Sequence, residues 1–116
     1  MDVAITALLV LSGIEHLYFF VLESFLWKKP LGRKTFQMDA ARAEATAQLA
    51  VNQGFYNLFL AIGLLWAAVS GDPTLRLYTL GFVVAAAVVG GVTVSRRVLL
   101  LQGTPAAVAL VLLLLR

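Results

Sequence analysis

The sequence has few of the residue types on which cofactor and metal chemistry depend. It contains no cysteine, one histidine and three prolines among 116 residues. The absence of cysteine excludes disulfides and thiolate chemistry, and it leaves the redox compartment undetermined. One histidine excludes bis-histidine haem ligation within one chain, and one histidine with two distant acids lacks the spacing of a zinc site. Because a serine-nucleophile motif and a glycine-rich phosphate loop are also missing, we predict no cofactor and no metal, and we assign no catalytic residue.

Charge is equally scarce. Only 13% of the residues are charged, whereas 61% are hydrophobic and the mean hydropathy is +0.93. Globular domains carry about 25% charged residues. A soluble fold of this size cannot cover so much apolar surface, so we predict that the protein is surrounded by a lipid bilayer.

The basic residues are placed as in a membrane protein. A net charge of +3 is compatible with nucleic-acid binding, but no aromatic residues interleave with the basic ones, so we predict no nucleic-acid partner. Most lysines and arginines follow the first and third apolar segments: Lys28, Lys29, Arg33, Lys34, Arg42, Arg96 and Arg97. Arg76 and Arg116 remain for the opposite side. The positive-inside rule therefore predicts an inner (plasma) membrane protein with both termini outside.

Four apolar segments predict one transmembrane domain over residues 1–116, with spans at about 3–27, 44–69, 73–94 and 98–115. The predicted fold class is all-α, an integral membrane four-helix bundle. Asp39 is expected to cap the second helix, and Ser70-Gly71-Asp72-Pro73 has the composition of a tight turn before a third helix. Met1-Asp2 supplies no basic n-region, so we interpret the first segment as a retained span.

The fourth span is interrupted by Gln102-Gly103-Thr104-Pro105, a set of residues that normally starts a helix. We predict a kink or a break near Gly103; the alternative is that the third span continues past Arg97 and the fourth helix is short. In the third span, Ala86 with Gly90 and Ala87 with Gly91 have the small-xxx-small spacing of closely packed helices. This spacing is compatible with packing inside one chain or with a homo-oligomer face.

Polar residues inside the spans are the candidate site. Ionisable groups in a bilayer are costly and usually face a bundle interior or a cavity. At 100° per residue Glu15, His16 and Glu23 share one face of the first span, but the two acids lie about 12 Å apart along the axis and form no close dyad. We place Glu15 near the midplane and Glu23 near the inner interface. Opposing groups that bind a ligand or ion are expected from the second and fourth spans: Asn52, Gln53, Tyr56, Asn57 and Gln102.

Three functions remain open from these residues. The leading hypothesis is a polar intramembrane pocket that binds or transports a small ligand, cation or proton. The second is a membrane-embedded enzyme that uses Glu15 and His16 for acid and base chemistry on a lipid-like substrate. The third is a non-catalytic scaffold or partner subunit, in which the polar groups only fix the helix register.

The chain also resembles a family of small bacterial membrane proteins known as a domain of unknown function, with about four spans and about 120 residues. The resemblance covers nearly the whole chain and implies a compact four-span bundle without implying an activity. It rests on these runs: Glu15-His16-Leu17-Tyr18, Leu22-Glu23, Phe25-Leu26-Trp27, Gly32-Arg33-Lys34, Asn52-Gln53-Gly54, Tyr56-Asn57, Thr93-Val94-Ser95 and Gln102-Gly103.

Overall fold

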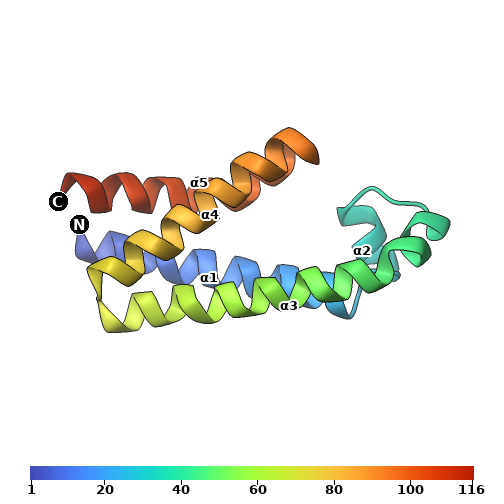
Figure 1. Cartoon of the computed structure of the whole chain (residues 1–116), viewed down its shortest axis with the longest axis horizontal. Coiled ribbons are helices and arrows are strands. Elements are labelled where there is room, and N and C mark those ends of the chain that lie inside the picture. Colours follow the sequence, from blue (N-terminus) through green and yellow to red (C-terminus); the bar gives the residue numbers. More distant parts are fainter. The chain divides into compact units, whose positions relative to one another are not determined.

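A computed structural model describes all residues from 1 to 116. All regular secondary structure in the chain is helical, as predicted, and there is no strand (Figure 1). Its elements are α1 (Asp2–Ser24), α2 (Pro30–Thr35), α3 (Ala40–Ser70), α4 (Pro73–Thr93) and α5 (Arg96–Leu115). All except α2 are long and apolar enough to cross a membrane. The protein is therefore an all-α, multi-pass membrane protein.

The chain divides into two compact units. One unit contains residues 1–15 and 61–116, and the other contains residues 16–60. Helices α1 and α3 each contribute to both units, and we describe the units separately. We call them the terminal unit, because it holds both chain ends, and the central unit.

In the terminal unit the predicted turn between α3 and α4 is confirmed. Gly71 has a φ of +70°, a conformation that glycine adopts without steric cost. The carboxylate of Asp72 accepts hydrogen bonds from the backbone N–H groups of Thr74, at 2.9 Å, and Leu75, at 3.3 Å. Pro73 occupies the first turn of α4, where its missing N–H has no cost.

Helices α4 and α5 pack closely through their small residues. A Cβ added to Gly91 would lie 2.6 Å from Leu99 Cβ, and one added to Gly103 would lie 2.9 Å from Ala87 Cβ. Of the two interpretations of the small-residue spacing, the structure supports packing within the chain for Ala87 and Gly91. Their face is covered by α5 and is not free to bind a second copy.

The predicted break near Gly103 is absent. Helix α5 continues from Arg96 to Leu115 and includes Pro105. Proline lacks the N–H that would bond to Leu101, but membrane helices tolerate this loss when neighbouring groups satisfy the backbone. Gly103 is therefore a site of close packing, whereas the sequence pattern indicated a helix start.

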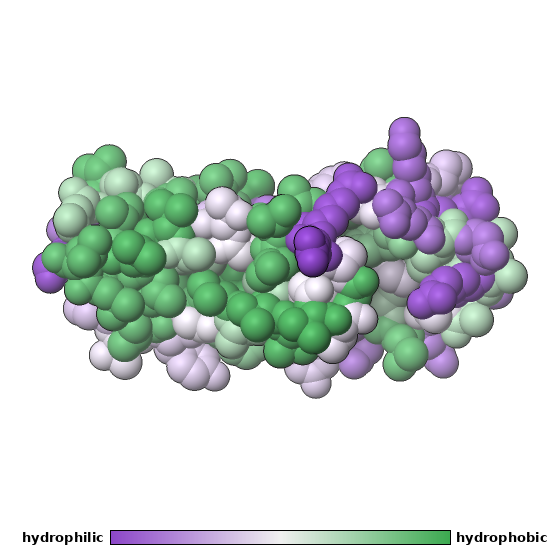
Figure 2. Space-filling model, turned by 90° about the horizontal axis from the view of Figure 1, so that it is seen from above, coloured by the Kyte–Doolittle hydropathy of each residue, from purple (hydrophilic) through white to green (hydrophobic).

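In the central unit, α1 ends at Ser24, before the predicted end of the span at Trp27. A short helix, α2, occupies the predicted connection because Pro30 is well suited to a first helical turn. The rings of Trp27 and Phe36 lie 4.8 Å apart, centre to centre, on either side of α2 in the sequence. The predicted cap of α3 is confirmed, since the backbone N–H of Arg42 donates to Asp39 at 2.7 Å. Hydrophilic residues gather around α2 and the nearby helix ends (Figure 2).

Candidate functional site

The candidate site is the contact between Glu23, in the last turn of α1, and Asn57, in the middle of α3. The Asn57 side-chain nitrogen donates a hydrogen bond to Glu23 Oε1. Both side chains are buried, and Glu23 is only 8% exposed. An acid buried in this way in a membrane helix is a functional-site candidate because its burial is costly. The structure thus brings together two of the residues that the sequence nominated.

Gly54 makes this contact geometrically possible. A Cβ at position 54 would lie 2.1 Å from Ser24 Oγ and 3.2 Å from the Phe20 carbonyl oxygen. The Ser24 hydroxyl also donates to the Val51 carbonyl at 3.4 Å. The backbones of α1 and α3 therefore approach closely here, which holds the short Asn57 side chain within reach of Glu23.

Trp27, four residues after Glu23, contacts the N-terminal part of α3. The Trp27 indole donates a hydrogen bond to Thr46 Oγ1 at 3.0 Å. An indole followed by two lysines is typical of the membrane interface. Asn57 follows Thr46 by eleven residues in α3, a rise on the order of 16 Å, which is about half of a 30 Å hydrocarbon core.

Glu23 is the next-to-last residue of α1. Its predicted position near the inner interface remains a prediction.

A cavity of about 280 Å³ extends from Glu23 to the basic end of the central unit. Its polar lining comes from Glu23, Ser24, Lys28, Lys29 and Gln48, and Trp27 contributes an aromatic wall. Lys28 also forms an ion pair with Glu44 at 3.4 Å. The lining thus combines a buried acidic residue, Glu23, with two exposed lysines, Lys28 and Lys29.

Several predicted site residues lie away from this contact. Asn52, Gln53 and Tyr56 are on the exposed side of α3. The predicted inward wall of polar groups on α3 therefore contains Asn57 but not these three. Gln102 lies half-buried in α5, in the terminal unit.

Glu15 and His16 flank the boundary between the two units. His16 is fully buried, and its ring meets Phe19 edge to face with centres 5.6 Å apart. Glu15 is half-buried, and its Oε1 is shielded without a hydrogen-bond partner. No group of three or more His, Cys, Asp or Glu side chains is arranged to hold a metal ion.

Comparison with known proteins agrees with the resemblance found in the sequence. The model of a family described as a protein of unknown function (DUF1304) matches residues 10–114. The chain belongs to this family. It is 27% identical over 115 residues to the uncharacterized protein YpaA of Lactococcus lactis subsp. lactis (strain IL1403), covering 96% of this chain and 97% of that protein. No solved structure matches the chain significantly.

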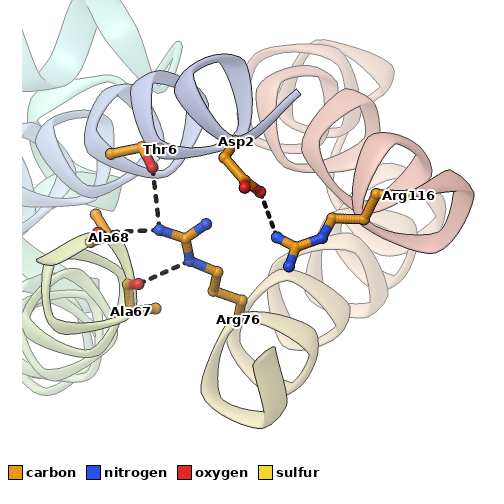
Figure 3. A network of polar contacts seen from close by, with 6 residues as sticks. All are labelled: Asp2, Thr6, Ala67, Ala68, Arg76 and Arg116. Atoms are coloured by element: carbon orange, nitrogen blue, oxygen red, sulfur yellow. Dashed lines mark hydrogen bonds and ion pairs between the residues drawn. The ribbon is translucent and has the colours of Figure 1, made fainter. Parts of the chain in front are cut away.

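Sequence reasoning missed one buried cation, Arg76 in α4. Its Nε donates to the Ala67 carbonyl at 2.9 Å, and its Nη2 donates to the Ala68 carbonyl and to Thr6 Oγ1, both at 3.0 Å (Figure 3). The last carbonyls of a helix lack partners within that helix and favour a cation. Arg76 donates to two of the carbonyls at the end of α3. The signal was an arginine shortly after a tight turn, which the charge distribution assigned only to the outer side of the membrane.

Proposed function

We propose that the protein binds a small solute through a cationic group that reaches Glu23 from the basic end of the central unit. The observation that carries this proposal is the buried Glu23 carboxyl, which receives a hydrogen bond from Asn57 and borders the cavity. An ionised carboxylate accepts several hydrogen bonds and donates none. One donor from the protein leaves acceptor positions for an ammonium group of the ligand.

The remaining lining supports the same ligand class. The face of an indole attracts cations, so Trp27 suits an ammonium or quaternary ammonium group. Lys28 is offset by Glu44, whereas Lys29 makes no ion pair. A small zwitterion therefore fits the charges, with its cationic end at Glu23 and its anionic end at Lys29.

Binding is favoured over catalysis because the cavity presents no nucleophile paired with a base. The Ser24 hydroxyl is engaged with a backbone carbonyl. A nucleophile needs a neighbouring base within hydrogen-bond reach. Transport is an extension of the binding proposal, since a buried carboxyl group in a membrane-spanning helix is a candidate coupling group for a cation or proton.

The test uses the intrinsic fluorescence of Trp27. The chain has two tryptophans, so the Trp66→Phe variant in lipid nanodiscs leaves Trp27 as the reporter. Choline, ethanolamine and glycine betaine serve as probes. We expect a saturable fluorescence change with at least one probe, and Glu23→Gln should weaken its affinity at least tenfold.

Asp2→Asn is the matched control, because Asp2 is a mostly exposed acid outside the cavity. It should leave the affinity unchanged. Equal binding by the Glu23→Gln variant would overturn the assignment of Glu23 as the ligand's acceptor. If no probe changes the fluorescence, the proposed binding of organic cations is wrong. Proton transport, measured as proton flux in liposomes, is then the part of the proposal that is left to test.

A further inference from the structure

An exposed stripe runs along α3 on the side opposite Glu23. Leu49 is 73% exposed, and Tyr56 and Phe59 are each 62% exposed. Asn52 is also exposed and lies between Leu49 and Tyr56 in the sequence. The spacings of three, four and three residues place these four side chains on one face of the helix, as in the a and d positions of a coiled coil. We call them the α3 seam.

The polar member of the seam lacks a partner within the chain. Asn52 follows Thr46 by six residues, which places it about 9 Å inside the interface marked by Trp27. The Asn52 side chain makes no hydrogen bond in the structure. An amide in hydrocarbon without a hydrogen bond is energetically costly, because it has lost its bonds to water. Lipid chains offer neither donor nor acceptor, so this face is incomplete in a single copy.

We propose that the α3 seam joins two copies of this chain as a parallel dimer. Two copies inserted with the same topology present Asn52 at the same depth. A side-chain amide has both donor and acceptor groups, so two such amides satisfy each other across a two-fold axis. One asparagine in an otherwise apolar seam also fixes register and favours a specific oligomer state. The partner on the α3 seam is therefore a second copy of this chain, because the two-fold symmetry places one Asn52 amide opposite the other.

The other candidate face for self-association is already covered. Gly91 and Gly103 lie against Leu99 and Ala87 within the α4–α5 pair. The small-residue motif is thus used inside one chain. The α3 seam shares no residue with the Glu23 cavity, so a test of the dimer does not test the proposed ligand site.

Cysteine crosslinking tests the dimer directly, because the chain has no native cysteine. A symmetric disulfide requires Cα atoms within about 7 Å, which holds only at the seam of a parallel pair. In liposomes at low protein density, Leu49→Cys and Phe59→Cys should each form a covalent dimer on mild oxidation. Val51→Cys is the matched control, since Val51 is exposed on the same helix but off the seam. Equal crosslinking at all three positions would overturn the proposal.

A second measurement isolates the amide. Asn52→Leu should lower the dimer association constant about tenfold, the effect of an interhelical hydrogen bond near the upper end of the measured range. Asn52→Gln should retain dimerisation because it keeps the amide. Helical content by circular dichroism should be unchanged in both variants, since Asn52 is exposed. A monomeric wild-type protein, or an Asn52→Leu variant that dimerises as tightly as wild type, would overturn the proposal.

Discussion

Asn57 is expected to stabilise the fold through its hydrogen bond to Glu23. Asn57→Leu leaves a buried carboxyl group without its donor, and we expect a loss of about 1–3 kcal/mol in the free energy of unfolding. The double variant Glu23→Leu with Asn57→Leu removes both polar groups and should recover much of this loss. Unfolding in mixed micelles, arranged as a double-mutant cycle, measures the difference. Additive effects of the two single variants would contradict a direct interaction.

Arg76, in the first turn of α4, is expected to contribute substantially to stability. Its guanidinium donates three hydrogen bonds, two of them to carbonyls at the end of α3. Arg76→Met should therefore cost about 2–4 kcal/mol, because hydrogen bonds to charged groups are stronger than neutral ones. The same unfolding measurement applies.

Arg116→Met is the matched control for Arg76. Arg116 pairs with Asp2, and both side chains are substantially exposed. An exposed ion pair contributes at most about 1 kcal/mol and often nothing measurable. Equal losses from the two arginine variants would show that Arg76 does not act through the α3 carbonyls.

At the scale of the helices, stability depends on close approaches between helix backbones, one between α1 and α3 and one between α4 and α5. In the central unit, a methyl group at position 54 would collide with Ser24 Oγ. We expect Gly54→Ala to destabilise the protein by about 1–3 kcal/mol, as for other overpacked sites. Adding Ser24→Ala should restore part of the stability, since it removes the nearest colliding atom.

Gly81→Ala provides the comparison for Gly54. A Cβ at position 81 meets nothing within 4 Å. Alanine is favoured over glycine in a helix interior by about 1 kcal/mol, so Gly81→Ala should be neutral or stabilising. If Gly54→Ala were equally harmless, the α1–α3 approach at Ser24 would not be as close as the structure indicates.

At the scale of the whole molecule, both chain ends belong to one unit. Arg116 of α5 pairs with Asp2 of α1, so the two termini lie at the same end of the terminal unit (Figure 3). An even number of spans requires this arrangement. Which side of the membrane the termini face remains a prediction from the distribution of lysine and arginine.

The sidedness is measurable with single cysteines because none is present in the wild type. In right-side-out vesicles, a membrane-impermeant maleimide should label Ser70→Cys, which is exposed at the end of α3 beside the α3–α4 turn, without permeabilisation. Labelling of Lys34→Cys, in α2, should need permeabilisation. The reverse pattern would invert the predicted topology.

The sequence by itself determined that lipid surrounds the chain, that the chain is helical, and where several helices begin and end. Low charge and long apolar runs require lipid, and lipid admits helices because their backbone groups are satisfied internally. Asp39, Gly71 and Asp72 were assigned correctly because caps and tight turns depend on neighbouring residues. The sequence also placed Glu23 and Asn57 among the candidate site residues, because both are polar residues inside apolar segments.

Only the tertiary structure decided which polar residues meet. Asn52 and Asn57 have the same side chain and lie five residues apart on α3, yet one is exposed and the other bonds to Glu23. Composition does not distinguish them, because the difference arises from the face that α1 covers. The role of Arg76 and the packing at Gly103 likewise depend on contacts between segments distant in sequence, which spacing along one helix does not specify.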